Sequence, residues 1–214
     1  MKIHAYDELY LANAQNVLGH ALDFAIMTLE LSPEAFEQAF VVSHASKQFG
    51  QGNPAYVAGL TGCEFAREVL AEVHFSYEDA EDVMYLDKSP EYWAGWALAY
   101  YQWECGLPFS EILSSVSFSE LIEMYPLYHE MDLSHFVEEM YARHLQLIPQ
   151  TRLSKLRKNA GLSQSQLAKL SGVSLRQIQL FEQRQREINK ASAFTLLQLS
   201  KALHCHMEDL LEFI

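Results

Sequence analysis

The stretch of residues 162–183, LSQSQLAKLSGVSLRQIQLFEQ, constrains the fold of this chain most tightly. It begins with a capping box, Ser163 with Gln166 three residues later, in which each side chain satisfies a free backbone N–H at the start of a helix. Gly172 permits the left-handed backbone that ends a helix, and Ser174 is a residue type that caps the next one. The sequence therefore predicts two short helices joined by a glycine turn.

Apolar side chains recur on one side of each predicted helix. This spacing predicts that the apolar side is buried and that the remaining residues face outward. The residues expected to face inward are Leu167, Ala168, Leu170, Val173, Leu175, Ile178 and Phe181. The residues expected to face outward on the second helix are Arg176, Gln177, Gln179 and Gln183. Arginine pairs bidentately with guanine, and glutamine with adenine, at base edges in the major groove. This outward face favours a DNA-reading helix over a helical pair that only packs.

The motif resembles the lambda-repressor/Cro-type helix-turn-helix family, often called the xenobiotic-response-element family, over about residues 152–213. The resemblance implies five helices in order and paired half-sites, hence a homodimer on DNA. The positions that it assigns to DNA are Gln164 at a phosphate and Arg176, Gln177 and Leu180 at base edges. Glu182 matches the acid with which the family ends this helix. Arg184 departs from the pattern, because many members have glycine there.

Charge divides the chain into two expected domains. Residues 150–214 carry ten Lys and Arg against five acids, a net charge of +5, which leaves five bases against 23 acids, a net charge of −18, for residues 1–149. The boundary is expected at Ile148, Pro149 and Gln150. Basic residues are dense where phosphates would lie, at Arg152, Lys155, Arg157 and Lys158. The candidate DNA-binding residues are Arg152, Lys155, Gln164, Ser174, Arg176, Gln177, Gln179, Gln183 and Arg184.

Helical spacing also runs through the N-terminal domain, so we expect an all-α protein in which an acidic helical domain precedes a five-helix lambda-repressor-like domain. One long helix is predicted for residues 6–30. Capping patterns at Ser32, Thr61 and Ser89 open further helices. Shorter helices are expected over residues 110–116, 117–124 and 132–144. No pair of strands with a hairpin turn is evident in the sequence.

Two features of the N-terminal domain are candidates for binding a partner. The aromatic segment that follows Ser89 is either a core helix with polar tips at its margin or a protein-binding hot spot, and Gly95 lets another backbone approach it closely. The acidic stretch of residues 77–89 is either a solvated loop or a docking surface for a basic partner. The candidate partner-binding residues are Glu78, Asp79, Glu81, Asp82, Trp93, Trp96 and Tyr100.

Several classes of protein are not indicated. The sequence contains no phosphate-binding loop and no nucleophile motif, so we expect no catalytic site and no cofactor. The cluster His204, Cys205 and His206 has no second group of ligands nearby in sequence, so a helix end is a simpler interpretation than a metal site. Three widely spaced cysteines without a CxxC pair fit a reducing cytoplasm. We expect neither a secretory leader nor a membrane span, which requires about 18 apolar residues.

The leading interpretation is a cytoplasmic bacterial transcriptional regulator, an autoregulating antitoxin-like repressor whose N-terminal domain binds a toxin-like protein partner. Regulators of the resembled family are common in toxin–antitoxin operons. In the alternative, the aromatic helix lines a pocket and the chain is a small-molecule-responsive regulator. In either case the acidic domain is expected to face away from DNA and to suppress non-specific binding, which is nearly all electrostatic.

Overall fold

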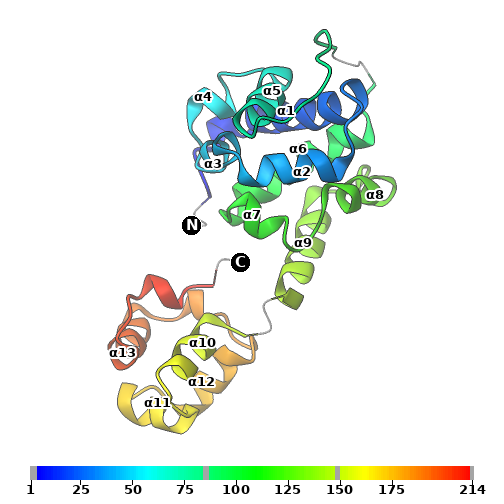
Figure 1. The fold of residues 1–214 in the computed structure, drawn as a ribbon. Coiled ribbons are helices and arrows are strands. Elements are labelled where there is room, and N and C mark those ends of the chain that lie inside the picture. The colour runs from blue at the N-terminus through cyan, green and yellow to red at the C-terminus, as the bar shows by residue number, and fades with distance from the viewer. Residues whose placement is uncertain (1–3, 84–86, 148–149, 213–214) are drawn as a thin grey trace. The chain divides into compact units, whose positions relative to one another are not determined.

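The computed structural model describes residues 4–83, 87–147 and 150–212. The chain divides into two compact units, residues 1–144 and 145–214, drawn from blue to red along the sequence in Figure 1. The described residues are helical or irregular and contain no strand, which confirms the all-α fold. Ile148 and Pro149, where the domain boundary was expected, lie outside the described residues. No helix in the described part of the chain is both long and apolar enough to cross a bilayer.

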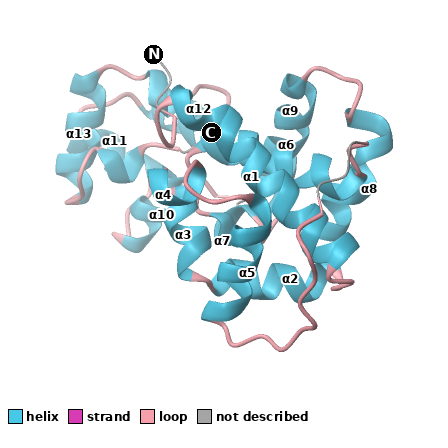
Figure 2. Ribbon diagram, turned by 90° about the horizontal axis from the view of Figure 1, so that it is seen from above, coloured by secondary structure: helices cyan, strands magenta, loops and turns pink. Residues whose placement is uncertain are grey.

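The N-terminal unit is built around two helices, α1 (Leu11–Asp23) and α6 (Pro90–Cys105), which pack along each other (Figures 1 and 2). Helix α6 is buried around most of its circumference. A Cβ added at Gly95 would lie 2.4 Å from the carbonyl oxygen of Leu18, and one added at Gly19 would lie 2.8 Å from the ring of Tyr92. The close backbone approach expected at Gly95 is therefore confirmed, and the partner is α1.

Replacing Gly95 with alanine is expected to destabilise the N-terminal unit by about 1–3 kcal/mol or more, because the new methyl group meets backbone atoms that cannot move aside. Urea denaturation followed by circular dichroism measures the change. Gly50→Ala is a matched control, since its Cβ would lie 3.6 Å from its nearest neighbours, an ordinary contact distance. Equal stabilities of the two variants would contradict this explanation.

The remaining helices of this unit cover the α1–α6 pair. They are α2 (Pro33–Val42), α3 (His44–Gly50), α4 (Pro54–Val57), α5 (Gly62–Glu72), α7 (Phe109–Ile112), α8 (Phe118–Tyr128) and α9 (Leu133–Leu147). The expected caps at Ser32, Thr61 and Ser89 are confirmed. Phe40 sits among other rings, 5.0 Å from Phe109 and 5.5 Å from Phe118 between centroids. These rings join α2, α7 and α8 into one apolar core.

The prediction of one long helix over residues 6–30 is wrong in its detail. The α-helix begins at Leu11, after a 3₁₀ turn over Glu8–Tyr10, and it gives way to a π-helical turn over Phe24–Thr28. The N–H of Leu29 donates to the carbonyl of Phe24, five residues back. Both kinds of turn keep Phe24 and its neighbours inward, so apolar spacing alone does not reveal the hydrogen-bond register.

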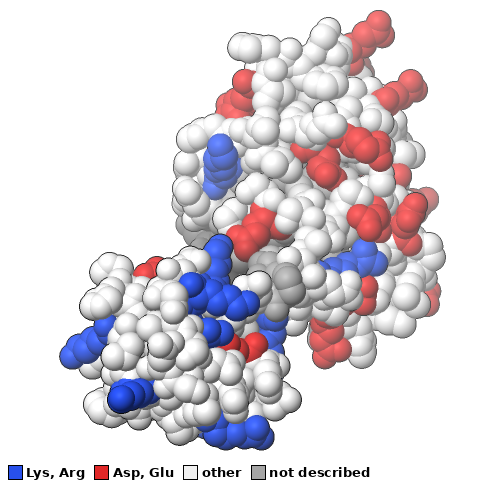
Figure 3. Space-filling model, turned by 60° about the horizontal axis from the view of Figure 1, so that its bottom comes forward, with Lys and Arg blue, Asp and Glu red and all other residues white. Residues whose placement is uncertain are grey.

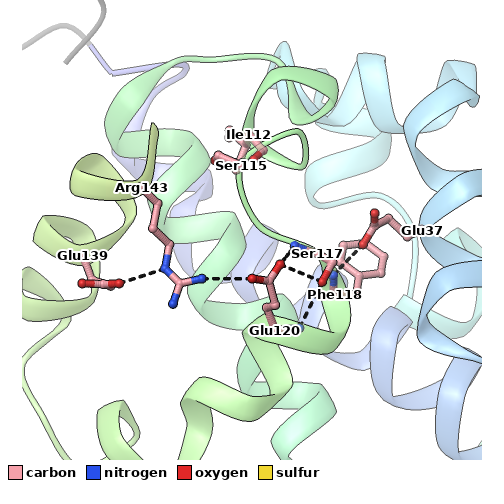
Figure 4. A network of polar contacts seen from close by, with 8 residues as sticks. All are labelled: Glu37, Ile112, Ser115, Ser117, Phe118, Glu120, Glu139 and Arg143. Carbon is pink, nitrogen blue, oxygen red and sulfur yellow. Dashed lines mark hydrogen bonds and ion pairs between the residues drawn. The ribbon is translucent and has the colours of Figure 1, made fainter. Parts of the chain in front are cut away.

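A polar network attaches α8 and α9 to the rest of the unit (Figure 4). Glu120 accepts hydrogen bonds from the backbone N–H and the hydroxyl of Ser117, at 2.8 and 2.9 Å, and completes a capping box at the start of α8. Arg143 on α9 lies 3.3 Å from Glu120 and 2.8 Å from Glu139. Glu37 on α2 accepts from the N–H of Phe118 at 2.5 Å. Helix α9, the last of this unit, is therefore held by ion pairs as well as by apolar packing.

The described part of the C-terminal unit contains four α-helices and two 3₁₀ turns, so the fifth helix implied by the resemblance is present only as a turn. The α-helices are α10 (Arg152–Asn159), α11 (Gln164–Ser171), α12 (Leu175–Glu182) and α13 (Ala193–Leu203), and the turns are Ile188–Lys190 and Glu208–Leu210. Its core is formed by Leu153, Leu167, Val173, Ile178, Phe181, Ile188, Leu199, Leu203 and Leu210. His204 ends α13 in the left-handed conformation, at φ 53°.

Candidate nucleic-acid interface

The two helices of the motif are set by their caps. The hydroxyl of Ser163 accepts from the N–H of Gln166 at 3.2 Å, and the side chain of Gln166 accepts from the N–H of Ser163 at 2.8 Å. Gly172 takes φ 73° at the end of α11. Ser174 then caps α12 by accepting from the N–H of Gln177 at 3.2 Å. The turn expected from sequence is present, and the hydroxyl of Ser174 is used within the protein.

One side of α12 is buried and the opposite side is free to meet a ligand. Ile178 and Phe181 face the core. Successive helical residues are rotated by about 100°, so Arg176, Gln179 and Gln183 form a stripe opposite that core. Gln177 lies on the flank, and its side-chain oxygen is 3.3 Å from the hydroxyl of Ser174. The centre of the outward face therefore consists of Arg176 and Gln183, both exposed, and of Gln179 and Leu180, both half-buried.

Two leucines expected to face inward do not. Leu170 is 62% exposed and Leu175 is 38% exposed. Leu175 is the first residue of α12 and lies outside the buried side formed by Ile178 and Phe181. An apolar side chain at the start of a reading helix can contact the methyl group of thymine. Leu175 is thus a candidate contact with DNA. It was predicted to face inward because it is apolar.

A buried ion pair holds α12 in place. Arg157 on α10 donates to Glu182 through Nε at 2.6 Å and through a terminal nitrogen at 2.9 Å, and its other terminal nitrogen donates to the carbonyl of Leu162 at 2.6 Å. Gln164, the first residue of α11, donates to the same carboxylate at 2.8 Å. The side chains of Arg157 and Glu182 are only 10% and 6% exposed. This cluster therefore joins α10, α11 and α12.

The assignment of Arg157 to the phosphate-contacting charge is consequently wrong. Its guanidinium is buried and its donors are used within the domain. The burial of Arg157 could have been predicted from the sequence. Arg157 follows the apolar Leu153 by four residues and so lies on the same, buried side of α10. Glu182 ends α12, as the resemblance implied, and the structure adds its partners.

Other basic side chains remain at the surface of this unit. Lys155, Lys158 and Lys169 are exposed, and Arg152 is half-buried at the start of α10. On the face seen in Figure 3, Lys and Arg gather on the C-terminal unit, whereas Asp and Glu predominate on the N-terminal unit. Exposed lysines of this kind supply the electrostatic part of DNA binding.

Arg184 adopts the backbone conformation of the glycine that it replaces. Its φ is 54°. The N–H of Gln185 donates to the carbonyl of Leu180 at 2.9 Å, and that of Arg184 donates to Phe181 at 3.1 Å. This is the hydrogen-bond pattern of a Schellman motif, which normally ends in glycine. The turn after α12 therefore keeps its geometry despite the departure at this position.

The acidic stretch of the N-terminal unit is partly neutralised from within. Arg67 on α5 lies 2.8 Å from Asp79 and 2.6 Å from Asp82, and it also donates to the carbonyl of Ala80 at 2.6 Å. The hydrogen bond from Arg67 lowers the pKa of Asp79 below its ordinary value. Glu78 and Glu81 are exposed. The four acids thus divide into two that fasten the loop to α5 and two that point into solvent.

The aromatic candidates belong mainly to the core. Trp93 is 8% exposed and packs edge-on against Tyr125 and Phe136, 5.9 and 5.5 Å away. Trp96 and Tyr100 are half-buried. This burial favours the core-helix alternative for Trp93 and leaves Trp96 and Tyr100 as the members within reach of a partner.

Residues 153–210 match a family model described as helix-turn-helix. This match covers the C-terminal unit only. It supports a DNA-binding transcriptional regulator, and the matched family is one of DNA-binding regulators. No curated protein and no solved structure matches the chain.

Proposed function

We propose that this protein is a cytoplasmic, autoregulating repressor that binds its operator as a homodimer and reads base edges through α12. The outward stripe of Arg176, Gln179 and Gln183, on a helix capped at its start and clamped by a buried ion pair at its end, carries the proposal. The side chains of Arg152, Lys155 and Arg184 would position the unit on phosphates. Gln164 and Ser174, whose side chains are engaged within the unit, would contribute through the N-termini of α11 and α12. Paired half-sites follow from two-fold symmetry of the dimer.

The full chain is expected to bind the DNA upstream of its own gene more tightly than random duplex. If the dimer makes six to ten phosphate contacts, raising the salt concentration from roughly 50 to 200 mM is expected to reduce its DNA affinity by about 10³-fold or more. Fluorescence anisotropy over that salt range measures the slope. Affinity that is equal for both duplexes, or that does not change with salt, would exclude this mode of binding.

We further propose that the N-terminal unit binds a basic, toxin-like protein and gives the repressor an antitoxin role. The surplus of acids in residues 1–149, 23 against five bases, supports it. Complementary charge mainly accelerates association. Since Asp79 and Asp82 are held by Arg67, the available negative charge in the described part of this stretch lies on Glu78, Glu81 and Asp87.

Glu78→Lys with Glu81→Lys is expected to slow association with a protein that co-purifies from the native host by about tenfold at low salt, and to leave unfolding unchanged. Surface plasmon resonance measures the rate. Glu123→Lys with Glu138→Lys, at exposed acids on α8 and α9, is the matched control for net charge. If both pairs slow association equally, only overall charge matters and the stretch of residues 77–89 is not the docking site.

A second candidate function is a small-molecule-responsive regulator. Helix α6, whose rings were expected to line a pocket, is packed within the core. A cleft in a different part of the same unit, between α3 and α7, favours this function.

A further inference from the structure

A cleft of about 330 Å³ lies between the end of α3 and the segment that leads from α6 into α7. Its apolar surface comes from Val41, Leu107 and Phe109, and the last two are buried. Lys47, Gly50 and Ser110 lie around it. This volume is at the lower end of the range for small-molecule sites, which are mostly apolar with a few polar groups.

Lys47 is the cation at this cleft, and it has no ion-pair partner in the part of the chain that the structure describes. The other described bases of the N-terminal unit are engaged. Arg67 and Arg143 each contact two carboxylates, and Lys88 lies 3.2 Å from His20 and 4.1 Å from the ring of Tyr92. Lys47 is exposed, so its ammonium group is available to an anion beside the apolar surface of the cleft.

Gln102 holds the two walls of the cleft at a fixed spacing. Its side chain is 1% exposed, and its amide nitrogen donates to the carbonyl of Gly50 at 2.9 Å and to that of Leu107 at 3.3 Å. Gly50 belongs to one wall and Leu107 to the other. A site whose walls are fixed before binding loses less conformational entropy when it takes a ligand.

We propose that this cleft binds a small organic carboxylate. The carboxylate would pair with the ammonium group of Lys47 and accept from the hydroxyl of Ser110, and the apolar body would lie against Val41 and the parts of Leu107 and Phe109 that line the cleft. An inorganic anion would leave this apolar lining uncovered, and a neutral ligand would leave Lys47 without a counter-charge. The proposal is independent of operator binding and of a protein partner.

The test is a titration of the ¹⁵N-labelled full chain with benzoate and hexanoate, and with benzamide as the neutral counterpart of benzoate. Both acids are expected to give saturable shifts of the amide signals of residues 46–51 and 106–110, with benzamide weaker by about tenfold or more. Shifts confined to other residues, equal affinity for benzamide, or no saturable shift up to about 10 mM of either acid would overturn the proposal.

Three variants separate the site from general charge. Lys47→Met is expected to weaken benzoate binding by about tenfold or more, whereas Lys47→Arg retains it. Lys88→Met removes a charge from the same unit outside the cleft and is expected to leave benzoate affinity unchanged. An equal loss in Lys47→Met and Lys88→Met would overturn the assignment of Lys47. Because operator affinity is not the readout, failure of this site leaves the proposed DNA binding intact.

Discussion

Replacing Arg157 with alanine is expected to destabilise the C-terminal unit by about 3–5 kcal/mol, the usual effect of removing one partner from a buried ion pair. The Glu182 carboxylate would remain buried, with Gln164 and Ser154 but no cation to stabilise its charge. The carbonyl of Leu162 would also lose its donor. Since these groups join α10, α11 and α12, the reading helix would lose its orientation together with its stability.

Thermal and urea unfolding of the full chain would show this as an earlier transition of the C-terminal unit. Lys158→Ala, at the exposed neighbouring position, is the control and is expected to change stability by about 0.5 kcal/mol or less. Replacing both partners by apolar residues, Arg157→Met with Glu182→Leu, is expected to cost much less than Arg157→Ala. A small effect of Arg157→Ala would show that the ion pair is not a structural support.

The same pair predicts a dependence on pH. Burial raises the pKa of Glu182, but hydrogen bonds from Arg157 and Gln164 outweigh it, and the pKa lies below its ordinary value of 4.5. Because the folded-state pKa is the lower one, the stabilisation is fully present above that ordinary value and is lost as the pH falls through the folded-state pKa. Unfolding of the Glu182→Gln variant is expected to depend less on pH in the acid range than that of the wild type.

Replacing Arg176 and Gln179 together with alanine is expected to reduce operator affinity by about 1–3 kcal/mol for each base pair that loses a bidentate contact. Discrimination between operator and random duplex should fall by the same factor, since phosphate contacts are unchanged. Gln177→Ala should have a smaller effect, because Gln177 lies on the flank and contacts Ser174. Gel shifts with wild-type and single-base-substituted operators measure these differences.

Lys155→Ala is the matched control for that experiment. Removal of an exposed lysine from both protomers of the dimer is expected to weaken binding to all sequences alike and to reduce the salt slope by about 2. Variants of α12 and of Lys155 that behave identically would mean that α12 does not read bases.

Local features of this protein could be predicted from the sequence because their causes are local. The capping boxes at Thr61 and Ser163 and the left-handed Gly172 each involve groups only a few residues apart. Helical spacing likewise predicted the all-α fold. Residues 153–210, which match the helix-turn-helix family model, contain the cap at Ser163 and the turn at Gly172.

Only the tertiary structure decided how side chains far apart in sequence pair. Arg157 meets Glu182 across 25 residues and forms a buried support. Arg67 meets Asp82 across 15 residues and fastens an exposed loop to α5. Lys47 lines the same cleft as Phe109, which is more than sixty positions away in the chain. The physical reason is that burial and pairing depend on which helices pack together, and the spacing of residues within one helix does not contain that information.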